Sequence, residues 1–164
     1  MRTLISTLVI LAAPGMLLLA GCDEEKILPQ SLAVDFSFSK LDGTPSDTFR
    51  TGEQFTVRLS ITNLTGGPRS WSFTMPDAIF RISSNDSVLI TSADGYAFPM
   101  VILGRSIKPG ETVTYQWLAP TSGLYPAGIT LAPGRYVASG QAHLLLDRFS
   151  PVSSVSRYVT IVSQ

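Results

Sequence analysis

Apolar and polar residues alternate one by one in several short runs of this chain. The clearest run covers 55–62, where Phe55, Val57, Leu59 and Ile61 alternate with polar residues. Successive side chains of a β-strand point to opposite faces of the sheet, so this pattern is typical of a strand that buries one face. Such a strand needs a second layer to cover its apolar face, and this need constrains the fold more than any other feature.

The same alternation recurs at short spacing along the chain. Further runs start near Leu32, Ser70, Phe80, Val88, Val113, Tyr136 and Ser156. Turn-forming residues separate them, such as Lys108-Pro109-Gly110 and Ala132-Pro133-Gly134, and no long window shows helical spacing. The pattern predicts an all-β fold, an immunoglobulin-like antiparallel β-sandwich of about eight strands.

The length of 164 residues fits one domain with a substantial core once a leader is removed. Charged residues make up only 15% of the chain, whereas Gly and Pro contribute 13 and 11 residues, a composition that favours frequent turns. The predicted core lies on the apolar faces of the alternating runs. It contains Val34, Phe36, Phe55, Val57, Leu59, Ile61, Trp117 and Tyr136.

The first residues have the pattern of a signal peptide: Arg2, an apolar stretch over 4–13, and a break at Pro14-Gly15. A membrane-spanning helix would need roughly 20 uninterrupted apolar residues. The sequence Leu19-Ala20-Gly21-Cys22 resembles the lipobox of bacterial lipoproteins. This resemblance implies cleavage after Gly21 and lipid attachment to the Cys22 thiol, which would anchor the mature protein to a membrane.

The chain is therefore expected to comprise a signal peptide (1–21), an acidic tether (22–31) and one β-sandwich domain (32–164). Localisation is predicted as the cell envelope, with the leaflet left open. An aspartate after the lipidated cysteine resembles an inner-membrane retention signal, whereas an acidic run such as 23–25 resembles a surface-export signal. The same charges also fit a simple solvating role beside the lipid headgroups.

The stretch 52–144 resembles the intracellular proteinase inhibitor (BsuPI) family of immunoglobulin-like domains. The matching blocks are 55–63 followed by Thr65-Gly66, 107–111 leading to Trp117, and 131–136 with Gly140. The sequence departs from the family at 78–82 and 88–92, where the family tends to carry an aromatic-acidic block and a tryptophan-bearing strand. The resemblance implies a binding domain, because some members inhibit proteinases.

The chain offers few residues for catalysis or metal binding. His143 is the only histidine and Cys22 the only cysteine, so a Ser-His-Asp triad or a zinc cluster is not expected. Asp77, Asp86 and Asp94 lie in turn contexts, where aspartate commonly bonds its own backbone. We predict no enzyme, no cofactor and no metal. The balance of 12 basic and 12 acidic residues gives no reason to expect nucleic-acid binding.

Two hypotheses of function follow. The first is a membrane-anchored lipoprotein whose non-enzymatic β-sandwich binds a protein partner, with a proteinase as the partner class that the family resemblance suggests. The alternative is a structural or assembly lipoprotein that docks onto a cell-envelope complex through a sheet face. Inhibition of a purified proteinase would distinguish them.

The segment 92–104 is the predicted binding element, with Tyr96, Phe98 and Met100 as its binding residues. Turn signals bound it, and Pro99 argues against a regular central strand. Two interpretations stay open. The segment folds back and plugs an open end of the sandwich with Phe98 and Ile102, or its aromatic and Met side chains stay exposed as an anchor patch.

Overall fold

The computed structural model describes residues 32–99, 102–142, 145–146, 150–151 and 155–164. The predicted signal peptide, Cys22, the tether, Met100 and His143 lie outside the described residues, and the statements about them stay predictions.

All regular elements of the described residues are β-strands, as predicted. They are β1 (Leu32–Ser39), β2 (Thr48–Arg50), β3 (Phe55–Asn63), β4 (Arg69–Thr74), β5 (Ala78–Ser84), β6 (Ser87–Thr91), β7 (Ile102–Ile107), β8 (Thr112–Ala119), β9 (Gly134–Ala142), β10 (Leu145–Leu146), β11 (Ser150–Pro151) and β12 (Val155–Val162). These twelve strands exceed the eight expected because the fold adds short pieces and a peripheral sheet to the sandwich.

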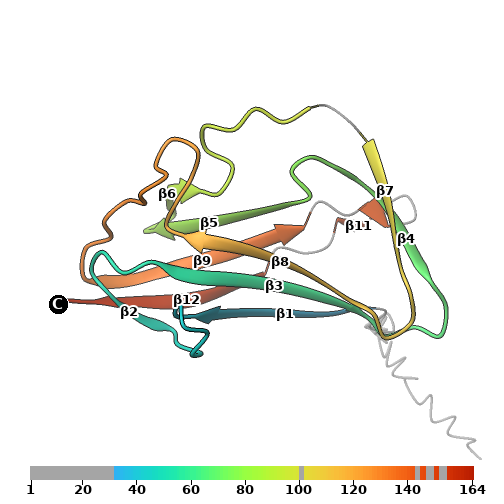
Figure 1. Ribbon diagram of the computed structural model, residues 1–164, viewed down its shortest axis with the longest axis horizontal. Coiled ribbons are helices and arrows are strands. Elements are labelled where there is room, and N and C mark those ends of the chain that lie inside the picture. The colour runs from blue at the N-terminus through green and yellow to red at the C-terminus, as the bar shows by residue number, and fades with distance from the viewer. Residues whose placement is uncertain (1–31, 100–101, 143–144, 147–149, 152–154) are drawn as a thin grey trace, which may run out of the picture.

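A three-stranded sheet, in the order β1-β3-β8, packs against a five-stranded sheet, in the order β2-β12-β9-β5-β6. Figure 1 shows the two sheets one behind the other. Aromatic side chains join them: the rings of Phe49 and Phe55 stack at 4.2 Å, and those of Phe80 and Trp117 lie 6.1 Å apart. Such stacked pairs add to the free energy gained from burying the rings.

The strand order and one hydrogen bond confirm the immunoglobulin-like type. β1 pairs with β3 in one sheet, whereas β2 pairs in parallel with the last strand, β12, in the other, so the start of the domain crosses between the sheets. At the start of β9 the Tyr136 hydroxyl donates a hydrogen bond to the Ala132 carbonyl oxygen at 2.8 Å. This is the tyrosine corner of immunoglobulin-like sandwiches.

The predicted core is confirmed except at one position. Phe36, Phe55, Val57, Leu59, Ile61, Trp117 and Tyr136 are buried. Val34 is 37% exposed, so its assignment to the core was wrong. It lies near the beginning of β1, an edge strand flanked only by β3, where the alternation continues but the opposite sheet gives less cover.

A third sheet, in the order β11-β10-β4-β7, stands at the right of the sandwich in Figure 1. The last part of the predicted loop 92–104 belongs to it, because β7 pairs with β4 along its whole length. The expectation that Pro99 excludes a central strand is consistent with this finding, since β7 is an edge strand that begins after the proline. Buried Asn63 ties this sheet to β3 by donating to the carbonyl oxygens of Gly67 and Ile107.

Candidate recognition surface

Two loops meet beside the end of β8. The first loop, residues 92–99, follows β6, and the second loop, residues 120–133, joins β8 to β9. β1 begins at Leu32, which pairs with the last residue of β3, whereas Ala119 at the end of β8 pairs with the first residue of β3. The second loop therefore starts at the end of the sheet remote from the beginning of the domain.

The first loop is fixed to β5 at its base. The backbone N–H of Ser92 donates to the Phe80 carbonyl oxygen at 2.9 Å, and the Phe80 N–H donates to the Ser92 hydroxyl at 3.0 Å. The Asp94 carboxylate accepts the N–H of Thr91 at 2.8 Å and its hydroxyl at 2.7 Å. Asp94 therefore closes its own turn, the role expected for a turn aspartate.

The second loop is held from inside the core. The indole N–H of Trp117 donates to the Thr121 carbonyl oxygen at 2.8 Å. Ser122 and Tyr125 exchange backbone hydrogen bonds of 3.1 and 3.2 Å, which closes a tight turn around Gly123 and Leu124. Because the Trp117 ring also stacks on Phe80, one buried aromatic pair supports both loops.

Two glycines let the loops touch backbone to backbone. The Leu124 N–H donates to the Asp94 carbonyl oxygen at 3.2 Å. A Cβ atom on Gly95 would lie 2.5 Å from the Leu124 nitrogen, and one on Gly123 would lie 3.0 Å from the Asp94 carbonyl oxygen. Gly95 also has a φ of +78°, a conformation that favours glycine. The two loops therefore form one packed unit.

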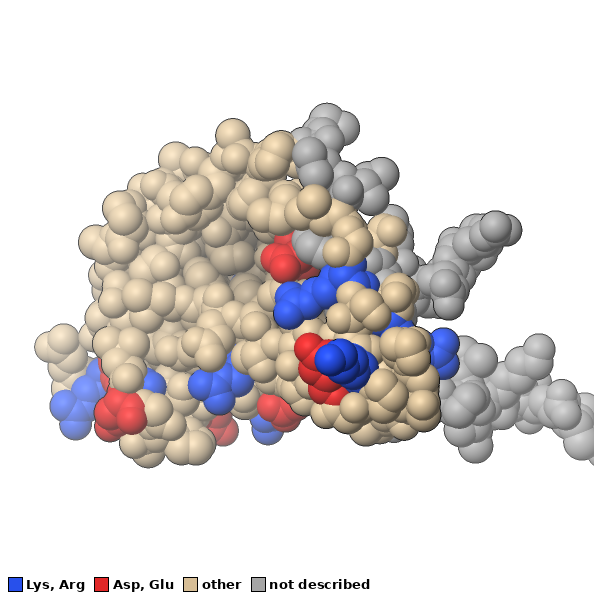
Figure 2. All heavy atoms as spheres, turned by 45° about the vertical axis from the view of Figure 1, so that its right-hand side comes forward, with Lys and Arg blue, Asp and Glu red and all other residues tan. Residues whose placement is uncertain are grey.

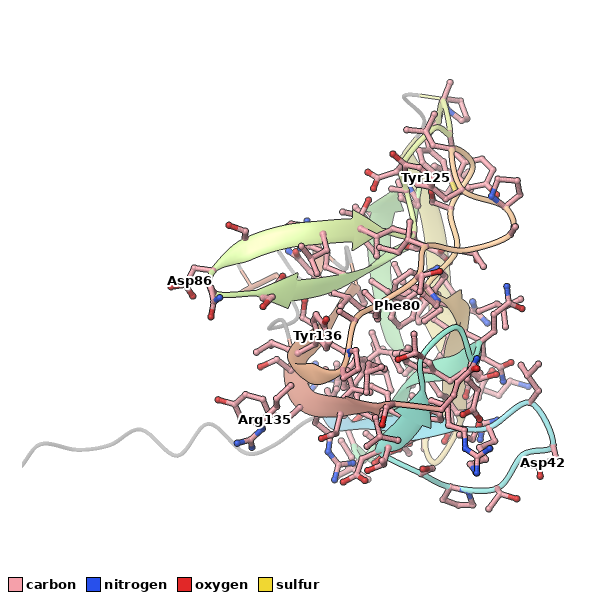
Figure 3. The ribbon with its side chains drawn as sticks, turned by 90° about the vertical axis from the view of Figure 1, so that its left-hand side faces the viewer. Asp42, Phe80, Asp86, Tyr125, Arg135 and Tyr136 are labelled. Carbon is pink, nitrogen blue, oxygen red and sulfur yellow. The ribbon has the colours of Figure 1, made fainter. Side chains whose placement is uncertain are left out.

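The large exposed side chains of this unit are aromatic or aliphatic. We name the four residues Tyr96, Phe98, Leu124 and Tyr125 the two-loop surface. Leu124 is 64% exposed, Tyr96 58% and Tyr125 48%, while Phe98 is half-buried with its ring 6.1 Å from that of Tyr96. Figure 3 shows Tyr125 at the end of the molecule opposite Asp42.

The two-loop surface lies in a region with only one charged side chain, that of Asp94. The sequence carries no Asp, Glu, Lys or Arg from Thr112 to Gly134, and Asp94 is the only one between Ser87 and Gly104. On the face drawn in Figure 2, charged side chains follow the lower part and the right of the described surface, while the upper part has none. Contiguous exposed apolar patches often mark interaction sites in proteins.

The structure brings together only part of the predicted site. Tyr96 is exposed, as the anchor-patch interpretation requires. Phe98 is half-buried, so it matches neither the plugging interpretation nor the anchor-patch interpretation fully. Leu124 and Tyr125 were missed, because their contact with the first loop depends on the tertiary fold. One sequence signal could have pointed to them. Leu124 and Tyr125 are large apolar residues that stand between Gly123 and Pro126, in a loop without charged residues.

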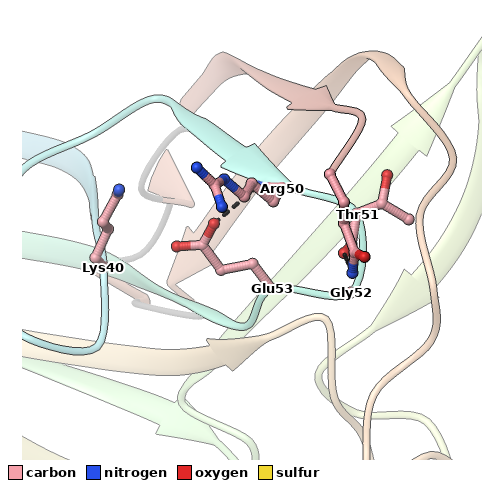
Figure 4. Close-up of a pocket in the computed structure, with 6 residues that line it drawn as sticks. Lys40, Arg50, Thr51, Gly52 and Glu53 are labelled. Atoms are coloured by element: carbon pink, nitrogen blue, oxygen red, sulfur yellow. Dashed lines mark hydrogen bonds between the residues drawn. The ribbon is translucent and has the colours of Figure 1, made fainter.

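A hollow elsewhere on the described surface is lined mainly by polar and charged residues. Figure 4 shows an open depression of about 500 Å³ between β1, β2 and the C-terminus, lined in part by Lys40, Arg50 and Glu53. The Glu53 carboxylate there accepts the Arg50 backbone N–H at 2.8 Å, a contact that shapes the turn. Among the described residues, no group of three or more His, Cys, Asp or Glu side chains could hold a metal ion.

One buried polar group stands apart. Among the residues that the structure describes, the Tyr115 hydroxyl on β8 is buried and has no hydrogen-bond partner. Burial is the main cause that raises the pKa of this phenol, the Asp77 carboxylate adds to the rise, and Arg105 opposes it. Because an ordinary tyrosine already ionises near pH 10, Tyr115 stays neutral at physiological pH.

No protein-family model and no curated protein matches the chain in sequence. Solved structures with a similar fold include a cycloisomaltooligosaccharide glucanotransferase from Paenibacillus, with 14% identity over 79% of this chain and a TM-score of 0.43. They also include the sporulation control protein Spo0M from Bacillus subtilis, with 11% identity over 82% of this chain and a TM-score of 0.47. An ApaA protein from Bordetella pertussis has 16% identity over 79% of this chain and a TM-score of 0.44.

The chain spans 14% of the glucanotransferase, 50% of Spo0M and 93% of the ApaA protein. Likeness at this level does not extend to activity, and the immunoglobulin-like assignment rests on the strand order and the Tyr136 corner. No helix in the described part of the chain has the length and apolar character needed to cross a bilayer.

Proposed function

We propose that the chain is a membrane-anchored lipoprotein whose β-sandwich binds a protein partner, a proteinase, through the two-loop surface. The observation that carries this proposal is the exposure of Tyr96, Leu124 and Tyr125 on two loops that are hydrogen-bonded to each other. Tyrosine is enriched at protein interfaces, and the centres of such interfaces are depleted of charge.

The form of this surface supports a macromolecular partner. Its side chains stand on loops at one end of the sandwich, whereas small-molecule sites are concave and enclose most of the ligand. The loops are also fixed by backbone hydrogen bonds and by the Trp117 indole, so little conformational entropy is lost on binding. Interfaces of proteinases with their inhibitors are of this preorganised kind.

The position of the expected anchor fits such a role. The lipid on Cys22 would connect to Leu32 through the tether, and the second loop starts at the opposite end of the three-stranded sheet. A tether of this length, 22–31, reaches at most roughly 33–36 Å when extended. The anchor would therefore hold the domain near the membrane while the two-loop surface faces a partner beyond it.

A proteinase is proposed as the partner because of the resemblance of 52–144 to the BsuPI family. The test measures inhibition of purified serine, cysteine and metal-dependent endoproteinases by the mature lipidated protein in detergent. We expect saturable inhibition of at least one of them, and Tyr96→Ser should raise its inhibition constant about tenfold, as truncation of an interface anchor does.

Tyr158→Ser is the matched control for Tyr96→Ser, since Tyr158 is 56% exposed on β12, outside the two-loop surface. It should leave the inhibition constant within about twofold of the wild-type value. A panel in which no proteinase is inhibited would refute the proteinase partner and leave an assembly lipoprotein as the better hypothesis.

The anchor has its own test. Cys22→Ala removes the only thiol that could be acylated, so the variant should accumulate as unprocessed or wrongly processed precursor. Mass spectrometry of the wild-type mature protein should show a lipidated N-terminal cysteine. An unmodified thiol at that position would refute the lipoprotein assignment.

A further inference from the structure

We propose that the tip of the second loop, the turn Ser122–Tyr125 with Leu124 outermost, is the element that inserts into the target, and that an apolar cleft of an endoproteinase receives it without cleaving it. This inference rests on the proposed function and names the inserted residue and the chemistry of the receiving site.

The geometry of the turn points to Leu124. Ser122 and Tyr125 exchange backbone hydrogen bonds of 3.1 and 3.2 Å, so Gly123 and Leu124 occupy the two central positions of the turn. Ser122 is only 4% exposed, whereas Leu124 is 64% exposed. The turn is thus rooted in the domain at its base, and its apolar side chain projects at the tip.

Backbone hydrogen bonds and packing against Gly95 hold the tip of the second loop in place. The Leu124 N–H donates a hydrogen bond to the Asp94 carbonyl oxygen, and the Gly128 N–H donates one to the Tyr125 carbonyl oxygen at 2.9 Å. The Leu124 side chain lies directly over Gly95, since a Cβ on that glycine would fall 2.7 Å from its Cγ. A side chain held this way needs little further ordering when it enters a partner.

The absence of charge sets the chemistry of the receiving site. No charged residue occurs from Thr112 to Gly134, and the nearest carboxylate, Asp94, is engaged by the Thr91 N–H and hydroxyl. A cleft lined by apolar groups can therefore close on Leu124 without burying a charge of the turn itself. Binding without charge pairs should also depend weakly on salt.

The same turn argues against substrate-like binding. A chain closed by reciprocal hydrogen bonds between Ser122 and Tyr125 is sharply bent, whereas a peptide that lies along a binding cleft as an added strand is extended. Leu124 would occupy the cleft while the backbone on either side turns away. The turn would therefore block the active site of the proteinase without being cleaved.

The experiment compares chymotrypsin, whose specificity pocket is a hydrophobic slot, with trypsin, whose pocket carries an aspartate. The inhibitor is the mature lipidated chain in detergent, as wild type, Leu124→Ala or Leu41→Ala. Leu41 is the matched control, because it is 65% exposed in the β1–β2 connection, away from the two-loop surface.

We expect the wild type to inhibit chymotrypsin and not trypsin, with less than a twofold change in the inhibition constant between low and high salt. Leu124→Ala should raise that constant about ten- to hundredfold, the factor expected when a leucine side chain is no longer buried in an interface. Leu41→Ala should leave it unchanged, and both variants should keep the wild-type melting temperature.

The outcomes separate this inference from the proposed function. Inhibition that Leu124→Ala leaves intact, trypsin inhibition, or a cut within 122–125 found by mass spectrometry would overturn the inference while the inhibitor function stands. If neither these two enzymes nor any member of the broader panel is inhibited, the proposed function falls and the inference falls with it.

Discussion

Phe55→Ala is expected to lower the free energy of unfolding by about 3–5 kcal/mol, the cost of removing a large side chain from a packed core. Phe55 is fully buried at the start of β3. Its ring stacks on Phe49 at 4.2 Å across the two sheets and meets Phe38 edge-on at 6.3 Å. Truncation would leave a cavity that both sheets border, measurable by urea denaturation.

Thr56→Ala is the control for this experiment, because Thr56 is the next residue of β3, only partly buried, and points to the other face of the sheet. It should change the free energy of unfolding by less than about 1 kcal/mol. A loss of similar size for both variants would show that Phe55 does not join the two sheets.

Gly95→Ala should separate the two loops. An added Cβ would lie 2.5 Å from the Leu124 nitrogen and 2.9 Å from the Gly123 carbonyl carbon, both backbone atoms that cannot move aside alone. The variant should therefore lose the hydrogen bond from Leu124 to Asp94 and, with it, most of the inhibition, although no side chain of the two-loop surface is removed.

Gly43→Ala separates the effect of contact from that of backbone conformation. Gly43 has a φ of +87°, close to the +78° of Gly95, but nothing lies within 4 Å of its would-be Cβ. It should lose about 1–2 kcal/mol from the left-handed conformation alone. Gly95→Ala should lose at least about 1 kcal/mol more, and only this variant should lose binding. Equal losses of stability and unchanged inhibition would refute the packed two-loop unit.

The fold was predictable because local pattern and tertiary structure agree. Alternation in β3 fixed which side chains face the core, since a strand buries every second residue. Val34 continues that alternation, but its exposure depends on how far the opposite sheet extends, which no local pattern encodes. β7 was hidden for a related reason, because its pairing with β4 forms a sheet outside the sandwich.

The candidate site was predictable only in its first loop. Asp94-Gly95 and Pro99 mark that loop, and Tyr96 is its exposed aromatic residue. The partnership with Leu124 depends on the approach of Gly95 to Gly123, which are distant in sequence and meet only when both sheets are assembled. Sequence periodicity reports on faces of strands and carries no information about which loops touch.

Tyrosine modification of the free and proteinase-bound protein would locate the interface. The reagent should react with Tyr96, Tyr125 and Tyr158 in the free protein, since all three are about half exposed. If the two-loop surface is the interface, binding should protect Tyr96 and Tyr125 and leave Tyr158 as reactive as before. Protection of Tyr158, with Tyr96 and Tyr125 still reactive in the complex, would rule out the two-loop surface as the interface.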